Sequence, residues 1–178
     1  SANGSLEMLT FLAIVGGTAA GPALFDLVRD APWMAGGVLT VPIDLPGRVV
    51  QAAVWKVQVG LVPVLMLDTD IPLNDPADRP ITGSLYVRGR EMRLHQELIL
   101  GIGGVRALRR LEITPAAWHL NEGHSAFMLM EQARELVIAG ATLDDALAQV
   151  RSKAVFTIHT PVPAGNERFA ADRVRELT

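Results

Sequence analysis

The chain has 178 residues, of which 49% are apolar and 20% charged; this composition excludes intrinsic disorder and suffices for one domain with a core. A net charge of −3, without a basic block, argues against nucleic-acid binding, and the absence of cysteine excludes disulfides, thiol nucleophiles and cysteine-ligated zinc. The same length suits a piece of a larger enzyme. Only Lys56 and Lys153 are candidates for a mechanism that needs a lysine Schiff base.

Residues 1–37 are left unassigned to a domain. Met8–Phe25 is uncharged, but glycines and a proline interrupt it, and it lacks the positive start and clean cleavage site of a secretory signal. Membrane association is therefore not expected, and we expect a cytoplasmic protein. We predict a buried strand or helix that ends near Gly16, followed by a turn over Gly16–Gly21, whose glycine spacing is not that of a dinucleotide loop.

Three strands are predicted between residues 38 and 70. Val38–Ile43, Val49–Val59 and Val62–Leu67 are rich in β-branched residues, and Pro46-Gly47 is a turn signal between the first two. Because the connections are too short for crossovers, the strands should form an antiparallel meander. A polar loop follows and ends near Gly83.

A helix is predicted from Arg90 onward, because one apolar stripe advances by three or four residues. The stripe consists of Leu94, Leu98, Ile102, Val105 and Leu108. Gly101, Gly103 and Gly104 lie inside it. A phosphate-binding loop is one interpretation, but the periodicity runs through these glycines, so close packing of the helix is favoured.

The remaining chain alternates between strands and helices. A short strand over Ala116–Leu120 precedes a helix that Asn121-Glu122-Gly123-His124 opens and Gly140 ends. Thr142 can cap a further helix, whose shared face consists of Leu143, Ala146, Leu147 and Val150. The last predicted elements are a strand over Ala154–Thr160 and a helix from about Asn166 to Leu177. Residues 90–178 therefore read α-β-α-α-β-α, which is the α/β class with a parallel strand pair.

Polar clusters follow both strands of this pair. Parallel strands end at the same edge of a sheet, so Asn121–His124 and His159-Thr160 should face one crevice. Asn121 and Glu122 either cap the following helix or present hydrogen-bonding groups to a polyhydroxylated ligand. For His159 we favour a ligand contact over a core position, because the rigid turn Pro161–Gly165 follows it directly.

The sequence leaves two questions about these residues open and argues against a third interpretation. Arg93, Gln96 and Glu97 share a helix face and form either a surface pair or a partly buried network near the crevice. A glycosidase with Glu122 and a second carboxylate, Glu97 or Glu167, is compatible with the sequence. A metal site is not expected, because His119 and His124 lack the spacing of helical zinc ligands.

Four ordered motifs carry a family resemblance. Trp118–Phe127 (WHLNEGHSAF) and Phe156–Phe169 (FTIHTPVPAGNERF), together with Leu65–Asp70 and Arg93–Leu98, resemble the α-glucan (glycogen/maltodextrin) phosphorylases of the bacterial type. The resemblance covers about Val38–Phe169. It implies that residues 38–178 are a fragment of the family's N-terminal, Rossmann-like domain in a glycosyltransferase-B architecture, with the β-meander at 38–70 and the α/β part at 90–178.

The resemblance also implies an activity and a set of site residues. The family transfers a glucosyl unit from an α-1,4-glucan to phosphate, giving glucose 1-phosphate, and uses pyridoxal phosphate bound by a lysine of the C-terminal domain. By match to the motifs, His159 would contact the transferred glucosyl unit, and its neighbouring backbone would help stabilise the oxocarbenium-like transition state. The substrate-binding residues would be Asn121, Glu122, His124, Glu167, Arg93 and Thr160.

No segment of this chain resembles the family's cofactor-lysine region. The chain should therefore be inactive alone and should need the missing C-terminal domain. A non-catalytic glucan-binding module is the alternative. The sequence leaves the oligomeric state open, a homo-oligomer included.

Overall fold

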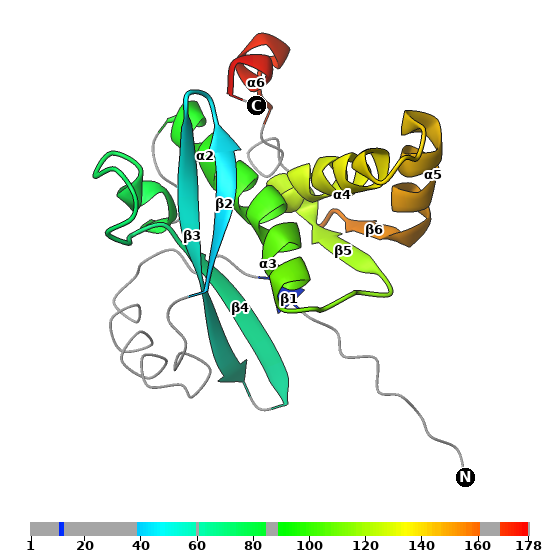
Figure 1. Ribbon diagram of the computed structural model, residues 1–178, viewed down its shortest axis with the longest axis horizontal. Helices are drawn as coiled ribbons and strands as arrows, with labels where there is room; N and C mark the ends of the chain where they lie inside the picture. The colour runs from blue at the N-terminus through cyan, green and yellow to red at the C-terminus, as the bar shows by residue number, and fades with distance from the viewer. Residues whose placement is uncertain (1–10, 13–38, 60, 85–88, 161–167, 178) are drawn as a thin grey trace.

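The computed structural model describes residues 11–12, 39–59, 61–84, 89–160 and 168–177 (Figure 1). A four-stranded sheet has the order β1-β4-β3-β2, with β1 at Phe11–Leu12, β2 at Thr40–Leu45, β3 at Arg48–Val59 and β4 at Val62–Asp68. A separate two-stranded sheet pairs β5 (Trp118–Asn121) with β6 (Ala154–Thr157). The structure therefore confirms the α/β class.

The predicted antiparallel meander is confirmed in β2, β3 and β4. Gly47 has φ +72° in the tight turn between β2 and β3, a conformation that glycine adopts without steric cost. The two-residue β1 runs parallel to β4. The rest of the N-terminal prediction, including the turn at Gly16–Gly21, lies outside the described residues.

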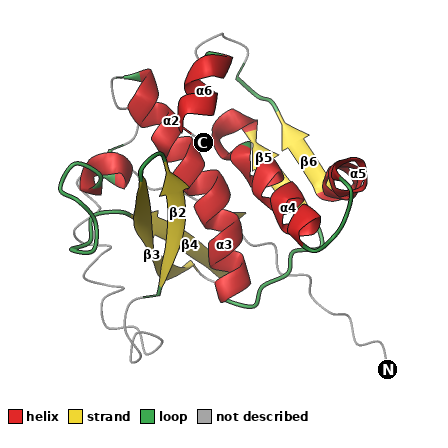
Figure 2. Cartoon of the chain, turned by 45° about the horizontal axis from the view of Figure 1, so that its top comes forward, coloured by secondary structure: helices red, strands yellow, loops and turns green. Residues whose placement is uncertain are grey.

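The predicted helix from Arg90 is confirmed and runs to Arg110. It consists of α2 (Arg90–Leu98), the π-helical turn η3 (Ile99–Gly103) and α3 (Gly104–Arg110); the π-helical turn was not predicted. Figure 2 shows this helix between the antiparallel sheet and the helices beside the parallel pair. The glycines allow close packing, because a Cβ atom on Gly101 would meet Met128 N at 2.7 Å. The phosphate-loop interpretation is therefore rejected.

One hydrophobic core joins these layers. Its fully buried members come from both sides of the long helix and from the helix itself, and they include Val41, Ile43, Val50, Leu65, Leu94, Leu98, Ile99, Val105 and Leu120. Burying such side chains contributes about 1.5–3 kcal/mol each. The core thus fixes α2 relative to β5, which carries the first predicted polar cluster at its end.

The helices after β5 are η4 (Glu122–Ser125), α4 (Phe127–Ile138) and α5 (Leu143–Lys153). The Thr142 cap is confirmed, since the Thr142 side chain accepts a hydrogen bond from Asp145 N at 3.2 Å. The predicted apolar face of α5 is only partly correct. Ala146 and Val150 pack against α4, whereas Leu143 and Leu147 are exposed.

The end of the chain departs from prediction at two boundaries. β6 ends at Thr157, so residues 158–160 continue without strand structure. The helix α6 spans Ala171–Leu177 and begins later than the predicted Asn166, because 168–170 are not helical. A short 3-10 helix, η2 (Arg79–Thr82), also occurs in the polar loop after β4 and was not predicted. Within the described part of the chain, no helix has the length and apolar character needed to cross a bilayer.

Candidate functional site

The two predicted polar clusters lie together. β5 and β6 are parallel, and Asn121, the last residue of β5, stands opposite Thr157, the last residue of β6. Both strands therefore deliver the following residues to one edge of the sheet, as their topology predicts. The residues gathered there, called the strand-end cluster, are Arg93, Glu97, Asn121, Glu122, His124, His159 and Thr160.

His159 is held by both residues at the end of β5. Its Nδ1 lies 3.3 Å from Glu122 Oε1, and its Nε2 lies 2.9 Å from Asn121 Oδ1. The His159 side chain is 58% exposed, so it is not a core histidine. The Asn121 side chain makes no cap hydrogen bond to the helix that follows. The capping interpretation of Asn121 is therefore wrong.

Glu122 has a strained backbone. Its φ is +58°, in the left-handed region that non-glycine residues rarely occupy. Glu112 has a similar φ of +57°, but it follows the end of α3, where Ile113 N donates to Leu108 O as in an ordinary helix stop. Glu122 instead is the first residue of η4, directly after β5, and its side chain is turned toward two histidines. Strain of this kind costs about 1–3 kcal/mol and is frequent at functional sites.

Glu122 is 5% exposed and yet favours its charged form. A hydrogen bond from the Thr160 side chain holds the pKa of the Glu122 carboxyl below its ordinary value, against the opposing effect of burial. The His159 charge and the backbone N–H groups of His159 and Thr160 act in the same direction as the Thr160 side chain. The cluster thus contains a buried carboxylate that stays ionised at neutral pH.

The other half of the cluster comes from α2. Arg93 Nη2 contacts His124 Nδ1, and Arg93 Nε lies 3.2 Å from Glu97 Oε1. His124 Nε2 in turn lies 3.5 Å from Glu122 Oε2. Arg93 and Glu97 are both buried or nearly so, which favours the partly buried network over the surface pair. Contacts thus run from Arg93 through His124 and Glu122 to His159.

Most predicted site residues are brought together. Arg93, Asn121, Glu122, His124, His159 and Thr160 all belong to the strand-end cluster, whereas Glu167 lies outside the described residues. Glu97 was not among the substrate-binding residues that the resemblance implies, but its spacing from Arg93 had suggested a partly buried network near the crevice. His119 points elsewhere, since its Nε2 pairs with Thr157 Oγ1 at 2.6 Å.

Curated relatives match over most of this chain. The glycogen phosphorylase of Mycobacterium tuberculosis is 48% identical over 133 residues, which are 71% of this chain and 15% of the relative. The maltodextrin phosphorylase of Thermococcus litoralis is 43% identical over 79% of this chain and 17% of its own length, and the glycogen phosphorylase of Aquifex aeolicus is 37% identical over 69% and 18%. The chain resembles a segment of the α-glucan phosphorylases.

The predicted resemblance to α-glucan phosphorylases is thus confirmed, and the chain spans about 15–18% of the length of these three relatives. No protein-family model matches it. Among solved structures, the catalytic domain of starch synthase IV from Arabidopsis thaliana, bound to ADP and acarbose, matches with a TM-score of 0.41 and 14% identity, covering 66% of this chain and 21% of that one. A TM-score this low does not distinguish one α/β architecture from another.

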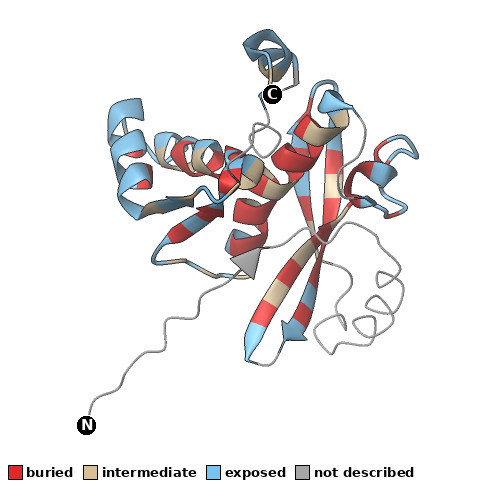
Figure 3. Cartoon of the chain, turned by 180° about the vertical axis from the view of Figure 1, so that it is seen from behind, coloured by how far each residue is buried: buried red, intermediate tan, exposed pale blue. Residues whose placement is uncertain are grey.

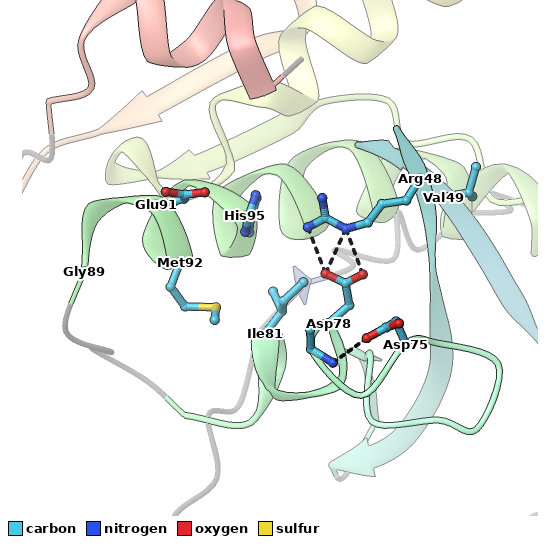
Figure 4. A pocket seen from close by; sticks show the side chains of 10 residues that line it. Arg48, Val49, Asp75, Asp78, Ile81, Gly89, Glu91, Met92 and His95 are labelled. Atoms are coloured by element: carbon cyan, nitrogen blue, oxygen red, sulfur yellow. Dashed lines mark hydrogen bonds and ion pairs between the residues drawn. The ribbon is translucent and has the colours of Figure 1, made fainter. Parts of the chain in front are cut away.

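A hollow elsewhere on the surface is lined by none of the residues of the strand-end cluster. It has a volume of about 610 Å³, and Figure 4 shows Arg48, Asp78, Glu91 and His95 around it. Burial lowers the pKa of His95, and the charge of Arg48 adds to this effect, so His95 is neutral at pH 7. Arg48 is paired with Asp78 at 2.8 Å, and Glu91 with Arg173 at 2.9 Å. These pairs neutralise much of the charge around the hollow.

The lowered pKa of Glu122 predicts a pH dependence of stability. A carboxyl with a depressed pKa in the folded state contributes stability above its unfolded pKa of about 4.3, and this contribution disappears as pH falls through the folded value. The difference in urea midpoint between the wild type and Glu122→Gln should therefore be constant near neutral pH and shrink below about pH 4.3. Glu112→Gln, at an exposed glutamate with a similar φ, is the matched control. A Glu122→Gln difference that stays constant down to pH 3 would contradict the assignment.

Proposed function

We propose that this chain carries the sugar-side half of the active site of an α-1,4-glucan phosphorylase, within the N-terminal domain of a glycosyltransferase-B architecture. The complete enzyme transfers a glucosyl unit from the non-reducing end of the glucan to phosphate, giving glucose 1-phosphate. As part of the same proposal, we place this activity in the cytoplasm. The identity of 37–48% with glycogen and maltodextrin phosphorylases supports the proposal.

The contact between Glu122 and His159 carries the proposal. These residues belong to the two longest motifs that resemble the family and are 37 positions apart in the sequence, yet Glu122 Oε1 lies 3.3 Å from His159 Nδ1. The contact lies at the edge of a parallel strand pair where the carboxyl ends meet, which is where α/β proteins bind ligands. A strained backbone at Glu122 gives the same edge a second mark of a functional site.

The chemistry of the cluster suits a sugar. Hydroxyl groups of a glucosyl unit both donate and accept hydrogen bonds. The cluster offers the ionised carboxylate of Glu122, the amide of Asn121 and the imidazoles of two histidines, and these groups form one connected set of contacts. His159, the most exposed of the histidines in the cluster, is the group that we assign to the transferred glucosyl unit. The charged Glu122 beside it would help stabilise positive charge that develops on the sugar in the transition state.

The resemblance implies pyridoxal phosphate, whose phosphate group would assist proton transfer to the substrate phosphate. Both lysines of this chain are exposed, Lys56 in β3 and Lys153 at the end of α5, and neither belongs to the strand-end cluster. These residues do not fit a Schiff-base site, which needs a lysine in a desolvated pocket. We therefore assign no step on this chain to the cofactor, and we propose that the cofactor lysine belongs to another part of the complete enzyme.

Exposed apolar residues support a larger protein. Val155, Phe156 and Ile158 are exposed on and after β6, and Leu143 and Leu147 are exposed on α5 (Figure 3). Parallel sheets are normally covered on both faces and contain more than two strands. This surface suits contact with further parts of the polypeptide, as expected if the complete enzyme has the length of the relatives.

The experiment that tests the proposal is glucan binding by the isolated chain. We expect saturable heat on titration with maltopentaose and none with the β-linked cellopentaose. His159→Ala and Glu122→Ala should each weaken maltopentaose binding tenfold or more, because a hydrogen bond to a charged group contributes about 1.5–3 kcal/mol. His119→Ala is the matched control. His119 lies on β5, the strand that leads to Glu122, but its side chain pairs with Thr157.

The chain should also form no glucose 1-phosphate from maltopentaose and phosphate. Clear phosphorolysis by the isolated chain would overturn the half-site argument. Maltopentaose binding that is absent, or that both variants leave unchanged, would overturn the assignment of the sugar site to the strand-end cluster.

A further inference from the structure

Two opposite charges face the same nitrogen of the His124 ring. Glu97 Oε1 is 4.0 Å from His124 Nδ1 and attracts a proton to that nitrogen. Arg93 Nη2 contacts the same Nδ1. A guanidinium carries five N–H donors and no acceptor, so the nitrogen that it contacts must accept and cannot carry a proton. The two neighbours therefore favour opposite placements of the imidazole proton.

The geometry resolves this competition in favour of Arg93. The Arg93 side chain is 14% exposed, and Glu97, whose side chain is 6% exposed, pairs with the Nε atom at 3.2 Å. Gln96 Oε1 accepts from Nη1 at 3.4 Å. With Nε and Nη1 engaged on α2, the Nη2 group is directed at His124.

We propose that Arg93, held by the buried carboxylate of Glu97, keeps the proton of the neutral His124 ring on Nε2, where it faces Glu122. His124 Nε2 lies 3.5 Å from Glu122 Oε2, so the ring presents a donor to the carboxylate and no lone pair that would repel it. Glu97 is on this view a positioning residue. It acts on the sugar site through Arg93 and His124.

The use of this arrangement in sugar binding rests on the proposed function, but the proton placement does not. A fixed Nε2–H donor would hold Glu122 in one orientation, and Glu122 in turn contacts His159. Preorganised polar groups of this kind lose little free energy when a ligand binds.

Nitrogen NMR of the histidine rings tests the proposal on the ligand-free chain, at a pH where His124 is neutral. In the wild type, His124 should show one protonated nitrogen, Nε2. In Arg93→Met, which keeps the apolar stem of the side chain and removes its donors, the proton should no longer stay on Nε2 alone, because Glu97 attracts it to Nδ1 while Glu122 attracts it to Nε2. In Glu97→Gln, the ring should show a mixture of both tautomers, because Arg93 loses its anchor. Arg90→Met, at an exposed arginine one turn earlier on α2, should leave the His124 signals unchanged.

Two results would overturn the proposal: a wild-type ring that carries its proton on Nδ1 or averages between tautomers, or an Arg93→Met ring that keeps the proton on Nε2. The wild-type measurement decides the matter even where a variant fails to fold. The NMR measurement is made without sugar. If the chain fails to bind maltopentaose while His124 carries its proton on Nε2, that result would count against the proposed function alone.

Discussion

Gly101→Ala is expected to destabilise the chain by about 1–3 kcal/mol, although alanine is the better helix former by about 1 kcal/mol. A Cβ atom at this position would lie 2.7 Å from Met128 N, 2.8 Å from Phe127 Cβ and 2.9 Å from Phe127 C. Two of these atoms belong to the backbone of the first turn of α4, which cannot rotate away. The helices must therefore separate, and the unfolding midpoint in urea should fall.

The same substitution should disturb the strand-end cluster. Gly101 lies on the helix that carries Arg93, and α4 follows directly after η4, which carries His124. Gly103→Ala is the matched control, because the three atoms nearest to its Cβ would be side-chain atoms of Leu67 and Ile43, at 3.2–3.4 Å. It should stay within about 1 kcal/mol of the wild type, and its His124 ring signals should not move. Equal stability of the two variants would contradict the role of close packing at Gly101.

The strands and the convergence of the two motifs were predictable because they depend on local patterns and on chirality. The alternation of apolar and polar residues indicated β3, and the helical spacing from Leu94 to Leu108 indicated the long helix. Parallel strands end at one edge whatever their side chains are, so the meeting of Glu122 with His159 followed from topology.

Other features were not predictable, because they depend on which neighbour covers a face. The apolar stripe of α5 contains four residues, but α4 covers only Ala146 and Val150, and no local pattern indicates this. The positive φ of Glu122 also had no signal, since glutamate is not a residue that favours the left-handed region. The burial of Glu97 depends on tertiary neighbours such as His124, which no local pattern indicates.

Glu131→Ala is expected to cost about 3–5 kcal/mol, the range for breaking a buried ion pair by removing one partner. The Glu131 side chain is 2% exposed on α4, where Oε1 accepts from Arg106 Nε at 2.8 Å and from Arg134 Nη2 at 2.7 Å. Arg106 keeps Asp44 Oδ2 at 3.0 Å and Pro42 O, so the lower end of the range is expected. The substitution would remove the ion pair that joins α3 to α4 and leave the contacts of Arg106 with β2 in place.

Glu135→Ala, one turn later on α4, is the control. Glu135 pairs with Arg109 at 3.0 Å, but both side chains are more exposed, and pairs near the surface contribute about 0–1 kcal/mol. Burial alone would raise the pKa of Glu131, but the hydrogen bonds from Arg134 and Arg106 outweigh it and hold the pKa below its ordinary value. The contribution of the charged group is therefore present above the unfolded pKa and lost as pH falls through the folded one. Urea midpoints of the wild type and Glu131→Ala should converge in acid, whereas a gap no larger than that of Glu135→Ala at pH 7 would show that the buried network contributes little.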